Sequence, residues 1–219
     1  MNKAIGDIFT LSIAIAAIIG WIRFKKINPA YYPFLFLIWI GLINELISIA
    51  IIYIVKGNST ALNNNLYSLL ESLIITWQFK KWKLFHQASK LFLGIIIVFI
   101  LLWGIEVFFI ADINHTGPYF RVTYSFIIIL MSLSMINIIL ANERKNILKN
   151  PIFLICLAFS IYFTYSVIIW SFWLYGLSLS KEFLKNLTAI LFYINLFSNL
   201  IYALAVLWMP TKHRFSLPS

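Results

Sequence analysis

The sequence predicts an all-α, polytopic membrane protein, a bundle of seven transmembrane helices that forms one domain over residues 1–219. Of the 219 residues, 62% are hydrophobic, 18% aromatic and only 11% charged, and the mean hydropathy is +0.92. A soluble domain carries about 25% charged and about 45–50% apolar residues. A chain of this size cannot bury such a surplus of apolar surface in one globule. The composition therefore excludes a soluble enzyme, a disulfide scaffold and a disordered chain.

Seven segments can cross a bilayer, which takes roughly 20 residues of apolar helix. The third is the weakest, because it contains Glu71, Gln78 and three asparagines. It is counted as a span because the charge pattern described next would break without it. The predicted spans cover residues 4–22, 32–55, 61–79, 91–111, 119–141, 151–175 and 183–209. The loops between them are short, which places any function in the membrane or at its faces.

The basic residues fall unequally on the two sides of this bundle. Of the 17 Lys and Arg residues, 12 follow the first, third, fifth and seventh spans, and five lie on the other side. Cytoplasmic loops carry an excess of Lys and Arg. The bias predicts an outside N-terminus and a cytoplasmic C-terminus. We expect a multi-pass protein of the cell inner (plasma) membrane. The net charge of +10 is therefore interpreted as topology, and no nucleic-acid partner is expected.

A short motif occurs twice. Asn28-Pro29 precedes the second span and Asn150-Pro151 precedes the sixth. As an internal duplication, it would relate the first three spans to the last three as parallel repeats, a layout like that of some seven-helix sugar transporters. The alternative is that membrane helices often begin at Pro or Asn, where a missing N–H is tolerated.

Three of the seven acidic residues, Glu45, Glu71 and Glu106, lie inside predicted spans. A carboxylate within a bilayer is costly, so it faces the bundle interior, pairs or is protonated. Arg121 is the nearest basic candidate to pair with Glu106. Polar residues at helical spacing share the face of Glu71, and we expect them to meet a similar stripe on the last span. The two stripes are Asn64, Tyr67 or Ser68, Glu71 and Gln78, and Asn195, Ser198, Asn199 and Tyr202.

These residues predict a ligand or proton site among the second, third, sixth and seventh spans. The alternative is that they hold the helices together through interhelical hydrogen bonds. For Glu71 a functional role is favoured, because three carboxyls without a fixed counter-charge exceed what helix association requires. The candidate site residues are Glu71, Glu45, Glu106, Tyr67, Asn64, Gln78, Tyr162, Tyr165, Asn195 and Asn199.

Motifs for catalysis, metals and cofactors are missing from the sequence. The three histidines fall in loops or tails, and Cys156 is the only cysteine, so we expect no metal centre. Retinal attachment needs a lysine inside the seventh span, and Lys185 lies only at its edge. No G-x-S-x-G, H-E-x-x-H or P-loop motif occurs. We therefore expect no cofactor and no catalytic residues.

Two stretches carry a resemblance to other proteins. Residues 64–71 (NNLYSLLE) run from a helix start into Glu71, and residues 150–153 (NPIF), followed by Ile161-Tyr162-Phe163, lead into an aromatic-rich helix. In these features the chain resembles the small, uncharacterised multi-span membrane proteins of Bacteroidota. The resemblance implies the membrane part of a sensory system that works with a kinase or regulator, and it assigns no catalytic residues.

Three functions agree with these features. The first is a non-enzymatic seven-helix sensor or accessory subunit that binds a small-molecule ligand and acts through a membrane or cytoplasmic protein partner. Its signal would leave through basic loops, which also suit anionic lipid headgroups of the bilayer. The second is a small proton-coupled transporter with a midplane site at Glu71, and the third is a lipid-modifying membrane enzyme. We expect the first, because a bare helical bundle needs another protein to act on.

Overall fold

The computed structural model describes residues 3–54, 60–86, 88–110, 117–142, 146–174 and 180–211. Over these ranges the chain is all-helical, as predicted, apart from an isolated bridge between Ile27 and Thr211. The predicted span ends at residues 55, 111 and 175 lie outside the described residues. The helices are α1 (Lys3–Thr10), α2 (Ile13–Arg23), η1 (Pro29–Tyr31), α3 (Tyr32–Tyr53), α4 (Ala61–Lys81), α5 (Ser89–Ile105), η2 (Glu106–Ile110), α6 (Pro118–Asn142), η3 (Ile147–Lys149), α7 (Pro151–Leu174) and α8 (Lys181–Trp208).

Six of the seven predicted spans correspond to helical segments long and apolar enough to cross a membrane. The remaining one is α4, whose 21 residues give a length of about 31 Å, enough for a hydrocarbon core. Its polar residues make α4 less apolar than the others. The six segments are Gly6–Arg23, Pro29–Tyr53, Ser89–Ile110, Pro118–Asn142, Pro151–Leu174 and Asn186–Trp208.

The polar residues of α4 are buried in the bundle. Leu62, Leu66 and Leu70, at intervals of four residues, are instead 45–46% exposed. A polar inner face and an apolar outer face are the reverse of a surface helix on a soluble protein. The mean hydropathy of α4 therefore understates how apolar its outer face is. The buried polar residues are Asn65, Ser68, Glu71, Ser72, Thr76 and Gln78.

The first predicted span is interrupted, which corrects the expectation of one helix over residues 4–22. Two residues separate α1 from α2. The Thr10 hydroxyl donates to the carbonyl of Asp7 (3.0 Å), and the Ser12 hydroxyl donates to that of Phe9 (2.6 Å). Such bonds compete with the helix ladder. The backbone bonds here shift partly to i→i−3, which breaks the helix without Gly or Pro.

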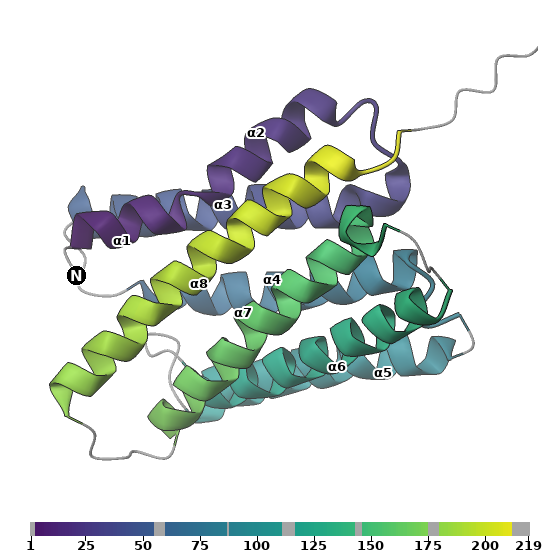
Figure 1. Ribbon diagram of the computed structural model, residues 1–219. Helices are drawn as coiled ribbons and strands as arrows, with labels where there is room; N and C mark the ends of the chain where they lie inside the picture. Colours follow the sequence, from purple (N-terminus) through teal and green to yellow (C-terminus); the bar gives the residue numbers. More distant parts are fainter. Residues whose placement is uncertain are drawn as a thin grey trace, which may run out of the picture.

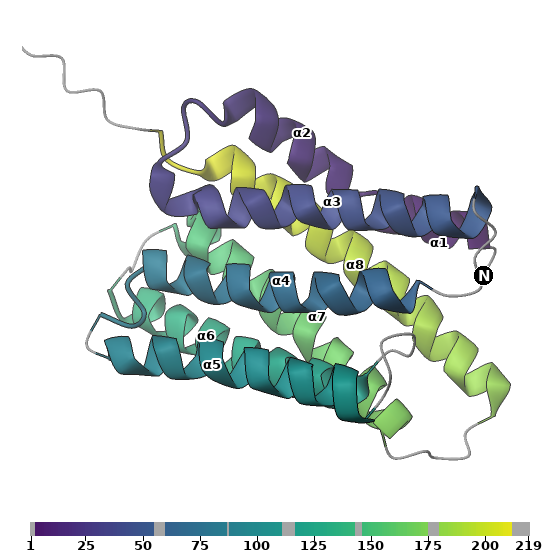
Figure 2. The ribbon, with the colours of Figure 1, turned by 180° about the vertical axis from the view of Figure 1, so that it is seen from behind.

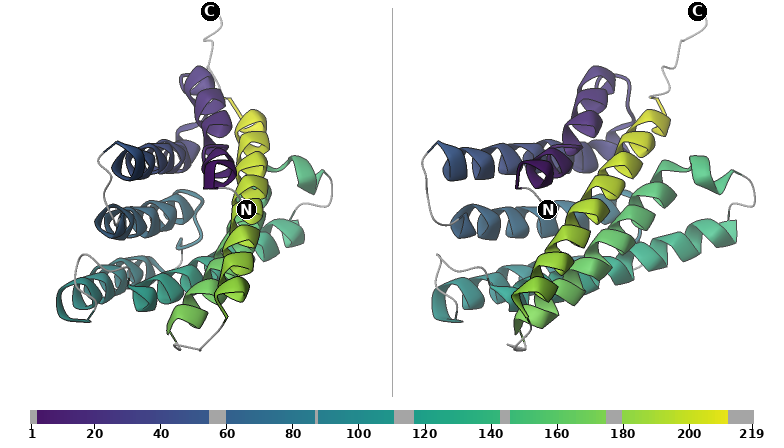
Figure 3. Two further views of the ribbon diagram at one scale, coloured as in Figure 1. Left: turned by 90° about the vertical axis from the view of Figure 1, so that its left-hand side faces the viewer. Right: turned by 60° about the vertical axis from the view of Figure 1, so that its left-hand side comes forward.

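The helices pack in chain order and close into a ring. Neighbours lie side by side from α2 to α8, and α8 packs back against α1 and α2 (Figure 1). From behind, α3, α4 and α5 form the near layer, with α6, α7 and α8 beyond them (Figure 2). The turned views in Figure 3 separate these two layers. Polar faces of helices that are distant in the sequence therefore meet inside the ring.

At one end the ring is fastened between the residues after α2 and the end of α8. The N–H of Asn28 donates to the carbonyl of Pro210 (3.0 Å). The Arg23 guanidinium satisfies carbonyls that a helix end leaves unpaired. It donates to those of Val206, Leu207 and Met209.

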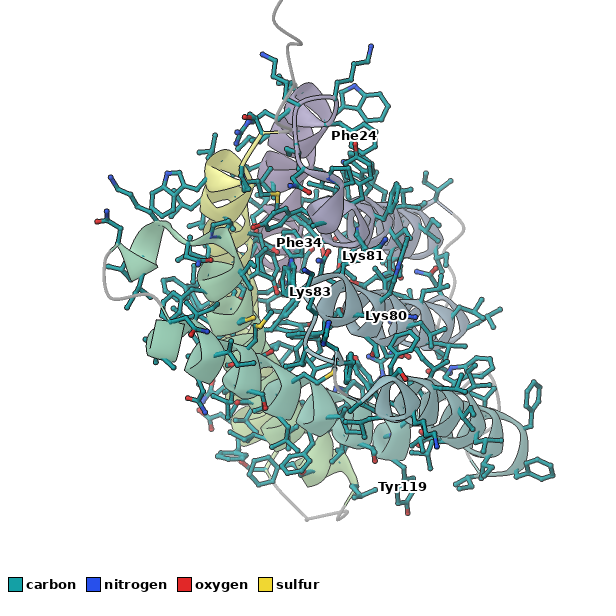
Figure 4. The ribbon with its side chains drawn as sticks, turned by 90° about the vertical axis from the view of Figure 1, so that its right-hand side faces the viewer. Phe24, Phe34, Lys80, Lys81, Lys83 and Tyr119 are labelled. Carbon is teal, nitrogen blue, oxygen red and sulfur yellow. The ribbon has the colours of Figure 1, made fainter. Side chains whose placement is uncertain are left out.

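The same end gathers basic residues. There the start of α3 meets the end of α4, where the rings of Tyr31 and Trp82 lie edge to face with centroids 6.2 Å apart. Figure 4 looks onto this end and shows Lys80, Lys81 and Lys83 together. The charge bias placed the loops richest in Lys and Arg on the cytoplasmic side. In the structure, the described residues of these loops all lie at one end of the bundle. Arg144, Lys145, Lys212 and Arg214 of the same set fall outside the described residues.

Both Asn-Pro pairs begin helices, as predicted. The Asn28 side-chain oxygen accepts from the N–H of Ala30 (2.9 Å) at the start of η1. The Asn150 oxygen accepts from the N–H groups of Ile152 (2.9 Å) and Phe153 (3.2 Å) at the start of α7. Both asparagines are N-caps, a role in which Asn is strongly preferred. Capping alone therefore accounts for the repeated motif.

Candidate functional site

A cavity of about 60 Å³ lies inside the bundle, with walls from α1, α2, α3, α4, α7 and α8. It has room for a few water molecules or one small ion or molecule. Most of its lining residues lie near the middle of their helices, so the cavity is at mid-depth. Six of the ten predicted site residues line it: Glu45, Glu71, Tyr67, Tyr162, Asn195 and Asn199.

Glu71 is buried and each of its carboxyl oxygens accepts a hydrogen bond. The Tyr67 hydroxyl, one turn earlier on α4, donates to Oε1 (3.1 Å). The Tyr124 hydroxyl reaches across from α6 and donates to Oε2 (2.9 Å). Hydrogen bonds to an ionised acceptor are the stronger kind. The two hydroxyls therefore stabilise a negative charge here and fix the position of the carboxyl group.

Glu45 brings a second carboxyl to the cavity from α3. The Thr10 hydroxyl, at the end of α1, donates to the Asp7 carbonyl and lies close enough to influence the Glu45 carboxyl. The carboxyls of Glu45 and Glu71 are close enough to interact electrostatically. The break between α1 and α2 thus stands beside a pair of acids.

The α8 helix contributes two amides that hold this break in place. Asn199 Nδ2 donates to the hydroxyl oxygen of Ser12 (2.9 Å) and to Asn195 Oδ1 (3.3 Å). Ser12 is one of the two residues between α1 and α2. Of the two polar stripes that we expected to meet, only parts line the cavity: Tyr67 and Glu71 of α4, and Asn195, Asn199 and Tyr202 of α8.

Aromatic rings make the rest of the wall rigid. Tyr202 packs edge to face on Phe34, with centroids 5.3 Å apart, and on Phe159, with centroids 5.8 Å apart. Aromatic pairs favour this geometry. Phe159 and Tyr202 both line the cavity. These contacts join α3, α7 and α8 and set the shape of the space.

No lysine or arginine is among the cavity-lining residues in the part of the chain that the structure describes. Arg121, expected beside Glu106, instead donates to the Asn64 carbonyl (2.8 Å) and lies 4.8 Å from the ring centre of Trp170. Over the described ranges no three His, Cys, Asp or Glu residues come together as for a metal. Although it lies outside the cavity wall, Arg121 is close enough for its charge to act on Glu71. With two carboxyls and no basic side chain in the described wall itself, the site still favours positively charged ligands.

Gln78 lies outside the cavity, although it shares the face of Glu71. Its Oε1 accepts from the N–H of Phe34 (2.7 Å), and its Nε2 donates to the carbonyl of Ala30 (2.7 Å). The first turn of a helix leaves its N–H groups without partners. Gln78 therefore serves as a cap for α3 that is supplied by a neighbouring helix.

Asn64 and Tyr165 are also absent from the cavity wall. Asn64 Nδ2 donates to the Thr60 hydroxyl oxygen (3.1 Å) at the start of α4. The Tyr165 hydroxyl donates to the carbonyl of Leu187 (3.0 Å) and links α7 to α8. Tyr165 thus makes the interhelical hydrogen bond that was the alternative to a functional role, whereas the side-chain bond of Asn64 is local to the start of α4.

Glu106 caps the N-terminus of α6. Its carboxyl oxygens accept from the N–H groups of Tyr119 (2.8 Å) and Phe120 (2.6 Å). A carboxylate is favourable at a helix N-terminus, where unpaired N–H groups and the helix dipole attract it. The structure thus gives Glu106 a structural partner, away from Glu45 and Glu71.

Gly117→Ala is expected to lower the thermal stability of the protein. A Cβ at residue 117 would lie 2.2 Å from Cδ of Glu106, so it would displace the capping carboxyl. Overpacking of this kind costs about 1–3 kcal/mol, which corresponds to a fall of roughly 2–12 °C in Tm. Gly104→Ala on α5 is the matched control, because no atom lies within 4 Å of the added methyl. Equal Tm values for the two variants, measured in detergent, would contradict this account.

Tyr124 is the functional residue that the sequence reasoning missed. It is buried and completes the hydrogen bonding of Glu71. A signal was present in the sequence, because Arg121, Tyr124, Ser125 and Ser132 recur at helical spacing along a mainly apolar span. That stripe indicates an inward face of α6.

No protein-family model, curated protein or solved structure matches this chain. The resemblance to small multi-span membrane proteins of Bacteroidota stays a prediction. The functional assignment therefore depends on the geometry of the cavity.

Proposed function

We propose that the chain is an integral protein of the bacterial inner membrane, with seven transmembrane segments and its basic end in the cytoplasm. Large apolar side chains make up much of its exposed surface, and α4 turns its polar residues inward. The collection of Lys and Arg residues at one end supports this orientation, which leaves the N-terminus outside. The basic loops lie on the same side of the membrane only if α4 also crosses it.

We further propose that this protein is a non-enzymatic sensor, which binds a small cation in the central cavity and acts on a protein partner. One observation carries the proposal. Two carboxyls, several tyrosine hydroxyls and two amides converge from four helices on one partly open space, with no basic side chain in its described wall. A ligand held by four helices biases how those helices pack, which is what a sensor needs.

The chemistry of the wall favours a monovalent cation of modest size. Carboxylate, hydroxyl and amide oxygens are hard ligands for alkali ions, and they also accept hydrogen bonds from an ammonium group. Aromatic rings such as Tyr202 add a surface that attracts cations. The volume of about 60 Å³ limits the ligand to an alkali ion or a small protonated amine.

Thermal unfolding of the purified protein in detergent tests the binding. Na⁺, K⁺ and methylammonium chlorides are the probes, and N-methylglucamine chloride at equal ionic strength is the bulky control. A ligand that binds only the folded state raises Tm with its concentration, by about 2.7 kcal/mol of stability at 100 times Kd. We expect a saturable rise with at least one small cation and none with N-methylglucamine. Equal Tm values in all four salts would refute the proposal.

Gly41→Val supplies a steric variant for the same titration. A Cβ at this position would lie 2.9 Å from Cδ1 of Ile13 and 3.3 Å from the hydroxyl oxygen of Tyr67, and all three residues line the cavity. The larger side chain narrows the space without changing its charge. We expect the cation-dependent rise in Tm to disappear in this variant, and an unchanged rise would place the ligand elsewhere.

The broken first helix favours a second candidate, a proton-coupled transporter. Transporters place substrate and coupling-ion sites near the bilayer midplane beside interrupted helices, and the α1–α2 break stands next to Glu45. Proteoliposomes that contain only this protein and an internal pH dye separate the two candidates. If a cation gradient drives protons across the membrane with the unmodified protein but not with Glu71→Gln, the protein is a transporter. If the cation binds but no protons move, the sensor remains the proposed function.

A further inference from the structure

A groove of about 310 Å³ opens at the basic end, between the residues that follow α4, the last turns of α6 and the start of α7. Apolar side chains, among them Ile138 and Ile152, form most of its wall. Its polar lining comes from Trp82, Lys83 and Asn142. No acidic residue lines the groove within the described ranges. The groove thus combines an apolar wall with a positively charged rim.

The backbone of Lys83 is held in a conformation that favours glycine, with φ of 65°. The N–H of Lys83 donates to the carbonyl of Lys80 (3.0 Å), and that of Leu84 donates to Phe79 (3.1 Å). These two bonds form a Schellman motif in which Lys83 takes the left-handed position. Glycine is usual there because it has no Cβ. A lysine at a position with such strain suggests a role for its side chain.

Trp82 adds a donor without a partner. Its ring is held edge to face by Phe79, with centroids 5.5 Å apart. Its Nε1 has no hydrogen-bond partner among the described residues. A buried donor of this kind calls for an explanation.

Further positive charge surrounds the groove. Lys81 and Lys83 are exposed beside each other at the end of α4 (Figure 4). Lys149 lines an adjacent pocket, and Ile152 is shared by both. The occupant of the groove must therefore carry negative charge as well as apolar surface.

We propose that this groove binds one anionic phospholipid of the cytoplasmic leaflet. The phosphate contacts the Lys83 ammonium, the Asn142 amide and the Trp82 N–H, and an acyl chain lies along Ile138 and Ile152. The groove joins the ends of α4 and α6, the depth at which headgroups meet the hydrocarbon. The inference rests on the proposed membrane location and is independent of the ligand in the central cavity.

Lys83→Gly tests the charge, because it removes the ammonium group and relieves the backbone at the same time. Native mass spectrometry of the full chain in detergent measures binding of dioleoyl phosphatidylglycerol. We expect the affinity to fall about fivefold, while Tm without lipid rises. Lys25→Gln is the control, since Lys25 is exposed after α2 and does not line the groove. Equal affinity in Lys83→Gly and the unmodified protein would overturn the proposal.

Ile138→Trp tests the apolar wall, with Leu140→Trp on an exposed part of α6 outside the groove as its control. We expect only the first to lose the bound lipid. If phosphatidylcholine binds as tightly as phosphatidylglycerol, the site is not specific for anionic lipid and the proposal is overturned. If inorganic phosphate displaces the lipid at equal concentration, the groove is a site for free anions and not for lipid. Failure of the protein to insert into bilayers would instead refute the membrane location.

Discussion

Glu71→Gln is expected to weaken binding of the stabilising cation by roughly 30-fold or more. Leaving one partner of a buried charge pair without the other costs about 2–5 kcal/mol. The substitution keeps the size of the side chain, but it removes the negative charge and places an amide NH₂ group beside a tyrosine hydroxyl. Titration of Tm with the cation that stabilises the unmodified protein measures the effect.

Two further variants make this result interpretable. Glu182→Gln removes an exposed carboxyl at the start of α8 and should leave the titration unchanged. Tyr124→Phe keeps the ring but deletes the hydrogen bond to Oε2 of Glu71, so it should weaken binding by a smaller factor. If Glu71→Gln titrates like Glu182→Gln, the cation does not bind at these carboxyls.

Gln78→Leu is expected to give the largest loss of stability among single polar substitutions on α4. It leaves the N–H of Phe34 and the carbonyl of Ala30 without their hydrogen bonds. Each buried polar group left unpaired costs about 1–3 kcal/mol. The combined loss corresponds to a fall in Tm of roughly 4–24 °C for a chain of this size.

Asn137→Leu is the control, because it makes a comparable polar-to-apolar change on an exposed position of α6. In detergent it should leave Tm unchanged or raise it slightly. If Gln78→Leu and Asn137→Leu unfold at the same temperature, the cap that Gln78 provides for α3 makes no measurable contribution to stability.

Helical spacing predicted which residues share a face, and this is why much of the cavity could be anticipated. Glu71, Asn195 and Asn199 face the interior as their periodicity indicates. Spacing does not specify depth, however. Gln78 lies seven residues beyond Glu71, about 10 Å along the helix, and at that level it meets the start of α3 instead of the cavity.

Other features depended on contacts that a single sequence does not reveal. Glu106 pairs with backbone groups of α6, and backbone donors leave no pattern in the choice of side chains. The interruption after α1 involves Thr10 and Ser12, without the Gly or Pro that usually signals a break. Helical periodicity also does not say which helices become neighbours, so the contact between Tyr124 and Glu71 emerges only from the fold.

The closure of α8 onto α1 and α2 has a consequence for how the protein is made. During synthesis α8 follows the other helices, so the wall that carries Asn195 and Asn199 is added after the rest of the ring. Until then the cavity that Glu45 and Glu71 line lacks the wall that α8 supplies. The cavity is therefore completed in one late step, when α8 packs against α1 and α2 and Arg23 donates to the carbonyls at the end of α8.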